Sequence, residues 1–177
     1  MLDNRSMSFT APTPDPVDGP LVGDDRPILE GMLRWHRATL SNICAGADAE
    51  QLAQRPFSHS TLSLLGLVRH LAKVERIWFR ERLASMSFDP MYDAALGKDS
   101  DFLGATASSA ESDFARFAAE CEASDVVAAQ YSFEDPVDCR GGPMSLGMVY
   151  VHMISEYARH NGHADIIREQ IDGVTGR

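Results

Sequence analysis

Apolar residues recur at intervals of three and four positions in four long stretches of this chain. This spacing predicts amphipathic helices over residues 26–45, 60–85, 108–130 and 145–172. Segments rich in Pro, Gly and Asp separate these stretches, and no part of the chain alternates convincingly like a strand. The hydrophobic pattern therefore predicts an all-α fold, a four-helix bundle.

The segments between the helices set the expected topology. Residues 88–104 are predicted to be a long loop, and this crossover allows the next helix to run parallel to its predecessor. A short helical turn is expected from Asp48, ended by Pro56. Residues 1–24 are rich in proline and glycine, which predicts an irregular N-terminal arm, mobile or laid along the surface of a bundle at 25–177. The sequence leaves open whether Met1 or Met7 is the natural start.

The last predicted helix carries an unusual set of polar residues on one face. At 100° per residue, four metal-capable side chains point within about 80° of one another: His152, Glu156, His160 and His163. The apolar residues expected on the same face are Met148, Val149, Ile166 and Ile167. A buried polar group without a partner costs about 2 kcal/mol or more, so something must satisfy these side chains. A metal ion is the leading candidate.

Two further histidines lie on apolar helix faces. His70 stands on the buried stripe of the second predicted helix, and Gly66, one turn earlier, leaves room for a close helix contact or for a ligand. His36 lies on the apolar face of the first predicted helix. A lone histidine on such a face is more often a core residue bonded to a neighbour, and for His36 this interpretation is favoured over a place in a pocket wall. The charged residues of the second helix are mostly expected to form a solvated face: Lys73, Glu75, Arg76, Arg80, Glu81 and Arg82.

Bundles bind metals through ligand pairs that project inward from facing helices. Glu156 and His160 are such a pair, four residues apart, and His70 can complete a set of three ligands. Two histidines and a carboxylate suit zinc first, with nickel, iron or manganese as alternatives. Three protein ligands leave one position open, which indicates catalysis. His152 and His163 are the spare candidates: either replaces Glu156 in this set or lines the pocket.

Composition narrows the classes of function. The chain has 177 residues, a net charge of −10 and a pI of about 4.9. An acidic surface repels nucleic-acid phosphates and anionic lipids, and no apolar run is long enough to span a membrane. No signal peptide is evident. The three cysteines are widely spaced and odd in number, so they are expected to be free thiols in a reducing cytoplasm.

Three stretches, residues 33–40, 60–76 and 156–165, resemble the DinB-like/YfiT-like superfamily of metal-binding four-helix bundles, most closely its actinobacterial mini-circle protein branch. The resemblance implies one metal ligand on the second helix, matched by His70, and a pair on the last helix, matched by Glu156 and His160. Many members have histidine at the position of Glu156, so this chain is similar to the mycothiol-dependent maleylpyruvate isomerase, which has glutamate there. His163 stands where many relatives carry glutamine.

The resemblance also implies a chemistry. Characterised relatives are transferases or isomerases that use low-molecular-weight thiols such as mycothiol or bacillithiol, and many are homodimers. The metal is expected to bind the thiol sulfur as a thiolate, which then attacks an electrophile. Arg159, beside the ligand stripe, either binds a carboxylate of the thiol or substrate or is a surface arginine paired with an acid. Two alternatives stay open: a hydrolase that uses metal-bound water with His152 or His163 as base, and a metal-binding bundle that is not an enzyme.

Overall fold

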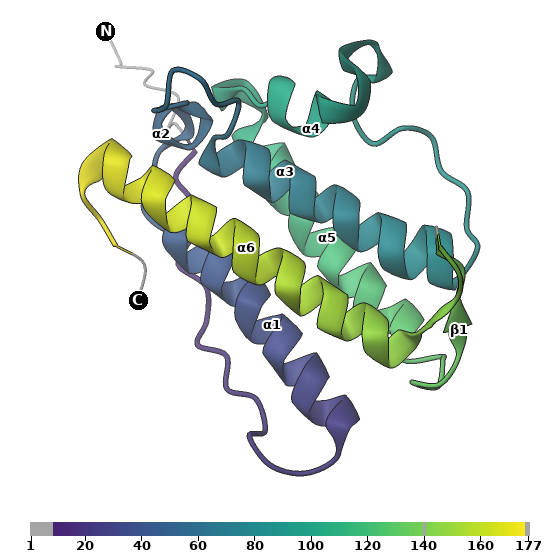
Figure 1. The fold of residues 1–177 in the computed structure, drawn as a ribbon. Coiled ribbons are helices and arrows are strands. Elements are labelled where there is room, and N and C mark those ends of the chain that lie inside the picture. Colours follow the sequence, from purple (N-terminus) through teal and green to yellow (C-terminus); the bar gives the residue numbers. More distant parts are fainter. Residues whose placement is uncertain (1–8, 140, 176–177) are drawn as a thin grey trace, which may run out of the picture.

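A computed structural model describes residues 9–139 and 141–175 and confirms the predicted all-α bundle (Figure 1). Its long helices are α1 (Asp25–Cys44), α3 (Leu64–Glu75), α5 (Ala110–Ala128) and α6 (Leu146–Asp172). The π-helical segment η1 (Arg76–Leu83) continues α3, so that the second long helix ends close to its predicted end. The expected short turn is α2 (Ala49–Ala53), which begins with a capping box formed by Asp48 and Gln51.

Contacts between side chains fix the direction of each helix. Arg69 pairs with Asp113, and Arg76, seven residues later at the start of η1, pairs with Glu120, seven residues further along α5, so α3 with its continuation runs parallel to α5. On α6, Asn161 bonds to α1 near its middle and Arg168 bonds to the end of α1, so these two helices also run parallel. The predicted crossover between α3 and α5 is therefore present, and Figure 1 shows α6 lying between α1 and α3.

The crossover is more ordered than a loop, which corrects the prediction for residues 88–104. It contains the 3-10 segment η2 (Ala94–Asp99), the short helix α4 (Ser100–Leu103) and the 3-10 turn η3 (Ala107–Ser109). The Asp93 side chain accepts a hydrogen bond from the Ala95 amide at 2.9 Å and starts the first turn. Gly97 has a φ of 71°, which lets the chain change direction before α4. Such single-turn elements are held by local caps, so they leave no hydrophobic period in the sequence.

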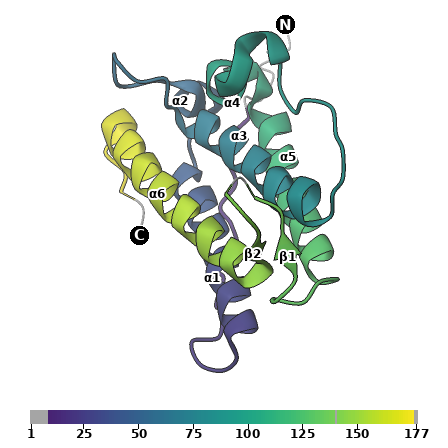
Figure 2. The ribbon, with the colours of Figure 1, turned by 45° about the vertical axis from the view of Figure 1, so that its right-hand side comes forward.

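The connection between α5 and α6 contains a small hairpin, where no strand was predicted. Strand β1 (Pro136–Val137) pairs antiparallel with β2 (Met144–Ser145). The hairpin lies at the end of the bundle where η1 ends and α6 begins (Figure 2). Strands of two residues are too short to show an alternating pattern, which is why the sequence did not reveal them.

The described part of the N-terminal arm lies against the bundle. The Ala11 amide donates to the Ala47 carbonyl, and the Gly46 amide donates back to the Ala11 carbonyl, both at 2.9 Å. The Phe9 ring packs on Phe114 of α5, with ring centroids 5.4 Å apart. Of the two predictions for the arm, attachment along the surface therefore holds for these residues. Met1 and Met7 lie outside the described residues, and the division into residues 1–24 and 25–177 stays a prediction.

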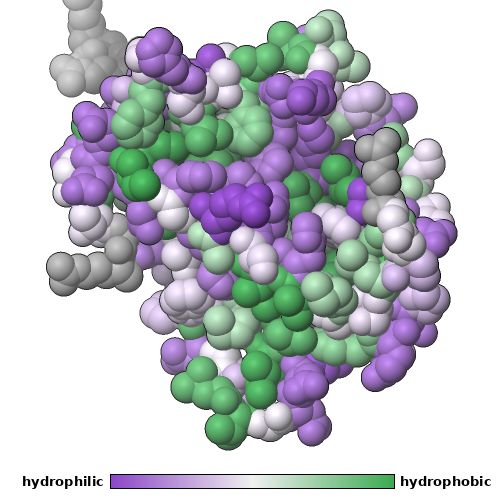
Figure 3. Space-filling view, viewed as in Figure 1, coloured by the Kyte–Doolittle hydropathy of each residue, from purple (hydrophilic) through white to green (hydrophobic). Residues whose placement is uncertain are grey.

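The core consists of aliphatic and aromatic side chains from all four long helices, yet it also contains charge. Glu75 is completely buried, so the expectation of a solvated charged face on the second helix is wrong for this residue. The reason is that α3 packs against both α5 and α6, which leaves it little surface for solvent. Conversely, α6 exposes apolar residues: Met148, Val151 and Ile166. Polar and apolar patches alternate on the face that Figure 3 shows. None of the described helices is long and apolar enough to cross a membrane.

Candidate metal centre

Three side chains from two helices converge at the seam between α3 and α6. Glu156 Oε1 lies 3.3 Å from His70 Nε2 and 3.2 Å from His160 Nε2. One ligand atom from each residue lies within 4.8 Å of the other two. These are three of the residues expected from the sequence to meet. The antiparallel course of α3 and α6 brings His70 opposite the Glu156–His160 pair.

The N-terminus of α3 and one glycine place His70 in this seam. Ser63 caps α3 by accepting a hydrogen bond from the Gly66 amide at 3.0 Å. A Cβ atom at Gly66 would lie 3.2 Å from Cδ1 of Phe102, whose ring stacks on His70 at a centroid distance of 4.9 Å. Of the two uses suggested for Gly66 from the sequence, a close helix contact or a ligand, the structure shows a close contact with α4 through the Phe102 ring.

A residue that sequence reasoning missed orients the His70 ring. Asp101 of α4 is 2% exposed, and its Oδ2 lies 2.8 Å from His70 Nδ1. Burial alone would raise the pKa of Asp101, but its hydrogen bond with His70 and the charge of Lys73 outweigh it and lower the pKa. The carboxylate is then an acceptor, so His70 Nδ1 donates to it; in the neutral ring Nε2 is therefore the unprotonated nitrogen that can bind a cation, and in the protonated ring Nε2 donates to Glu156. A carboxylate behind a ligating histidine is a common feature of metal sites. Asp101 lies in a run that reads as a polar turn, and nothing in its spacing pointed to His70.

The electrostatics of the three residues are strongly coupled. Hydrogen bonds from His160 and His70 hold the pKa of Glu156 well below its usual range, against the effect of burial. Burial would lower the pKa of His70, but its bonds to Asp101 and Glu156 outweigh burial and raise it. The side chains of His70 and Glu156 are each 19% exposed and that of His160 is 11% exposed. The cluster is thus largely shielded but still reached by solvent.

This donor set fits a divalent cation. Tetrahedral bonds of about 2.0–2.1 Å to nitrogen and oxygen place neighbouring ligand atoms about 3.3 Å apart. The two separations from Glu156 Oε1 are 3.3 and 3.2 Å. One carboxylate and two imidazoles bind zinc and related ions, and the carboxylate behind His70 supplies the outer hydrogen bond.

Most of the chain matches the model of one protein family. The model of the mycothiol-S-transferase family matches residues 28–173, which include all four long helices except the first residues of α1. The chain belongs to the mycothiol-S-transferase family. This family is part of the DinB-like superfamily, so the resemblance seen in the sequence is confirmed at that level. No curated protein and no solved structure matches the chain.

Two other predicted pocket residues, His163 and Arg159, lie on the α6 side of the cluster. His163 Nδ1 lies 3.4 Å from His160 Nδ1, so His163 touches a member of the triad. Burial lowers the pKa of His163, and the nearby charges of His160 and Arg159 lower it further. Arg159 is exposed and forms no ion pair with any acid in the described part of the chain. Of its two interpretations, the surface ion pair is therefore not observed.

The remaining histidines lie further from the triad. His152, one turn before Glu156, packs its ring on Trp78, with centroids 4.4 Å apart. His36 contacts the opposite side of α6, where Asn161 Nδ2 donates to the His36 carbonyl at 3.0 Å. Burial lowers the pKa of His36. The His36 ring also contacts Trp35, and neither Trp35 nor Asn161 belongs to the triad. These contacts agree with the favoured interpretation of His36 as a core-edge residue bonded to a neighbour.

The buried stripe of α6 differs from the predicted one. Met148 and Ile166 are 49% and 59% exposed, so they do not share a buried face with the triad. The buried residues of the helix include Met153, Tyr157 and Ala164. Because α6 packs between α1 and α3, its buried arc is centred between these helices, and the triad lies at the edge of the arc on the α3 side. That edge position is what leaves the triad open to solvent.

A cavity beneath the crossover includes Lys73, the partner of Asp101, in its lining. It has a volume of about 310 Å³, and its lining includes Lys73, Tyr92 and Ser100. Lys73 Nζ lies 3.5 Å from Asp101 Oδ2, which connects this cavity to the hydrogen bond behind His70. A larger cavity of about 610 Å³ lies between the N-terminal arm and α1, with Trp35 and Asn42 in its wall, and its lining contains no member of the triad.

Proposed function

We propose that this protein is a metal-dependent S-transferase that joins mycothiol to an electrophilic small molecule. The observation that carries the proposal is the convergence of His70, Glu156 and His160 in a chain of the mycothiol-S-transferase family. The family points to the thiol, and the three converging ligand atoms point to a bound divalent cation, zinc being preferred over nickel, iron or manganese.

In this proposal each residue has a defined task. Glu156, His70 and His160 would hold the cation, on the side of the seam that solvent reaches. A bound divalent cation lowers the pKa of a thiol, so that the thiolate is available at neutral pH. Asp101 keeps the Nε2 atom of His70 directed at the site. The proximity of the two substrates in one partly shielded seam supplies the orientation that the reaction needs.

The proposed reaction is a nucleophilic transfer. The thiol proton passes to solvent, the thiolate sulfur forms a bond to an electrophilic carbon, and a leaving group such as halide departs with its electron pair. With an epoxide, the ring oxygen is the leaving group and takes up a proton. Arg159 has no acidic partner among the described residues and stands beside His163, so it can contact an anionic group of either substrate.

The proposal includes the setting in which the protein works. We infer a cytoplasmic protein, because a thiol cosubstrate and three free cysteines suit a reducing compartment. A homodimer is a further prediction, and the exposed apolar residues Val151 and Ile166 on α6 support it. Absence of nucleic-acid binding is expected from the net charge of −10.

The test is turnover of an electrophile, such as 1-chloro-2,4-dinitrobenzene or monobromobimane, with and without mycothiol. We expect product formation above the rate without protein only when mycothiol and metal are both present, one divalent ion per chain, and loss of both metal and catalysed turnover in His70→Ala. His59→Ala, which changes an exposed loop histidine, is the control and should keep both. Product formed from water without thiol would identify a hydrolase instead, and a chain that binds no metal would refute the proposal.

A further inference from the structure

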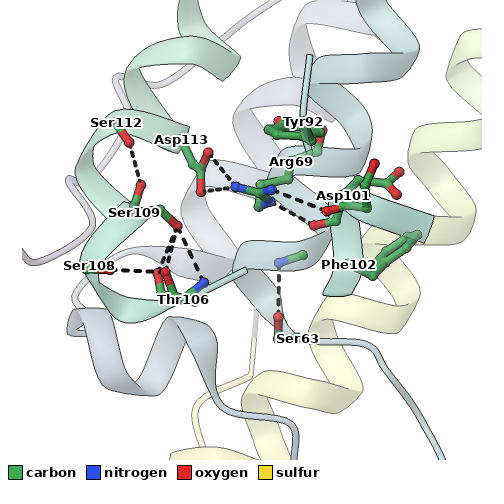
Figure 4. Close-up of polar contacts among 12 residues, drawn as sticks. Ser63, Arg69, Tyr92, Asp101, Phe102, Thr106, Ser108, Ser109, Ser112 and Asp113 are labelled. Carbon is green, nitrogen blue, oxygen red and sulfur yellow. Dashed lines mark hydrogen bonds and ion pairs between the residues drawn. The ribbon is translucent and has the colours of Figure 1, made fainter. Parts of the chain in front are cut away.

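Arg69, the residue before His70, holds the segment that contacts the His70 ring. Its Nε donates to the Asp101 carbonyl at 2.7 Å, and its Nη2 donates to the Ser100 carbonyl at 3.3 Å. Its Nη1 donates to both carboxylate oxygens of Asp113 at 3.0 and 2.9 Å. Figure 4 shows the guanidinium between Asp113 on one side and the Asp101 backbone on the other. One buried side chain therefore joins α3, α4 and α5.

The Arg69 guanidinium is enclosed by an aromatic ring and by the backbone of the crossover. Its guanidinium carbon lies 3.9 Å from the centre of the Tyr92 ring, and Tyr92 Oη donates to the Arg69 carbonyl at 3.0 Å. A Cβ atom at Gly104 would lie 2.9 Å from Arg69 Nη2 and 3.0 Å from the Ser100 carbonyl oxygen. The Arg69 side chain is 8% exposed. A side chain so enclosed fixes the backbone that it holds.

The acid that anchors Arg69 is also fixed. Asp113 lies in the first turn of α5, where the helix dipole favours a carboxylate. The chain enters that turn through a hydroxyl cluster, in which Ser109 Oγ donates to the Thr106 carbonyl at 2.9 Å and Ser112 Oγ donates to the Ser109 carbonyl at 2.9 Å (Figure 4). The start of α5 thus sets the position of Asp113, and through Arg69 that of α4.

The geometry points to Arg69 as a positioning residue for the metal site, acting through Asp101 on His70, an inference that rests on the proposed function. Arg69 holds the backbone of residues 100 and 101, the Asp101 carboxylate holds His70 Nδ1, and Phe102 stacks on the same ring. Arg69 and His70 are consecutive residues of α3 and bond to the same segment of α4. Arg69 donates to its backbone carbonyls, and His70 bonds to the Asp101 carboxylate. The task of Arg69 is to keep that carboxylate where it fixes the Nδ1–H form of His70.

The chain offers a matched control seven residues further along the same helix. Arg76 also pairs with an acid of α5, Glu120, and its guanidinium carbon also lies over a crossover ring, 5.0 Å from the centre of Phe88. Its side chain is 14% exposed, close to the value for Arg69. Among the described residues, Arg76 forms no hydrogen bond or ion pair with residues 100–102. A purely structural arginine should behave like Arg76, and a positioning residue should not.

The experiment compares Arg69→Lys with Arg76→Lys in the full chain. Zinc affinity is measured by competition with a chromogenic chelator, and thermal unfolding of the metal-free proteins measures the structural cost. Loss of an outer hydrogen bond typically weakens metal binding 10- to 100-fold. We expect about tenfold or more for Arg69→Lys, a similar loss for Asp101→Asn, and less than about twofold for Arg76→Lys. Gly104→Ala, which crowds Nη2, should weaken zinc binding in the same direction as Arg69→Lys.

A second measurement reads the His70 ring without any metal. In the metal-free protein, ¹⁵N NMR at a pH where the ring is neutral should show the Nδ1–H tautomer in wild type and in Arg76→Lys, and a mixture of tautomers in Arg69→Lys. Equal zinc affinities or equal tautomers in the two lysine variants would overturn the inference. If wild type bound no zinc, the proposed function would fail, and the tautomer alone would still decide the role of Arg69.

Discussion

Two polar clusters both draw residues from α3 and α6, the first with Arg37 of α1 as well, and they are built differently. In the first, Glu75 of α3 accepts hydrogen bonds from Arg37 Nε at 2.7 Å, Arg37 Nη2 at 2.7 Å and Tyr157 Oη at 2.8 Å. In the second, His70 of α3 and His160 of α6 meet Glu156 at 3.3 and 3.2 Å. Glu156 and Tyr157 are neighbours in sequence, so adjacent residues of α6 serve the two clusters.

The difference lies in how completely each cluster satisfies itself. The carboxylate of Glu75 accepts from two N–H groups of one charged guanidinium and from one hydroxyl, and its side chain is fully buried, so it needs nothing further. In the triad, three groups that can each offer a lone pair converge at an edge that solvent reaches. A closed network of donors and acceptors joins helices, whereas converging lone pairs leave a place for a cation. We therefore assign stability to the first cluster and chemistry to the second.

The largest expected effect comes from breaking the Glu75 cluster. Arg37→Met leaves the Glu75 carboxylate buried without its ionic partner, which typically costs about 3–5 kcal/mol. The free energy of unfolding from urea titration should fall by that amount, while the zinc affinity of the folded variant changes less than about twofold. A change in zinc affinity as large as that of a triad variant would show that the two clusters are not separate.

The corresponding substitution in the triad is Glu156→Gln, which keeps the size of the side chain but removes its charge. We expect zinc affinity to fall by more than the 10- to 100-fold typical of an outer hydrogen bond. The free energy of unfolding of the metal-free variant should change by less than about 1 kcal/mol, because partly exposed ion pairs contribute little. Chelator competition and urea titration measure the two quantities. Retention of wild-type zinc affinity would remove Glu156 from the ligand set.

A smaller effect should appear in the pH dependence of the metal-free protein. The pKa of Glu156 is lowered in the folded state, so its contribution to stability is present above about pH 4.3 and is lost as the pH falls through the folded value. The pKa of His70 is raised, so its contribution is complete below about pH 6.5 and is lost as the pH rises through the folded value. The gap in melting temperature between wild type and Glu156→Gln should therefore be wider at pH 5.5 than at pH 8.5. A gap that widens with rising pH would contradict this coupling.

The smallest expected effect concerns the cysteines, none of which is a candidate metal ligand. Burial raises the pKa of Cys44 to about 12, and burial together with the charge of Glu75 raises the pKa of Cys121. Both thiols should stay protonated and react slowly with a disulfide reagent in the native protein. Cys139 is partly exposed and should be labelled first. Rapid labelling of Cys121, with loss of turnover, would instead indicate a protein thiol in the reaction.

The sequence predicted those features that repeat or that lie on one helix. The long helices follow from hydrophobic period, and Glu156 with His160 follows from a spacing of one turn. The contacts that depend on tertiary structure were not predictable in this way: Asp101 reaches His70 across 31 residues, and Arg37 reaches Glu75 across 38. The predicted burial of Met148 and Ile166 was wrong for a related reason, since a helical wheel does not tell which neighbours a helix packs against.

The central claim is that the His70, Glu156 and His160 cluster holds a metal that binds the thiol sulfur. The most direct test is the absorption spectrum of the protein loaded with cobalt(II) in place of zinc, before and after addition of mycothiol. Thiolate bound to cobalt gives an intense charge-transfer band in the near ultraviolet, and we predict that this band appears on addition of mycothiol to wild type and not to His70→Ala. Cobalt bound at one ion per chain, with no such band at saturating mycothiol, would contradict the account.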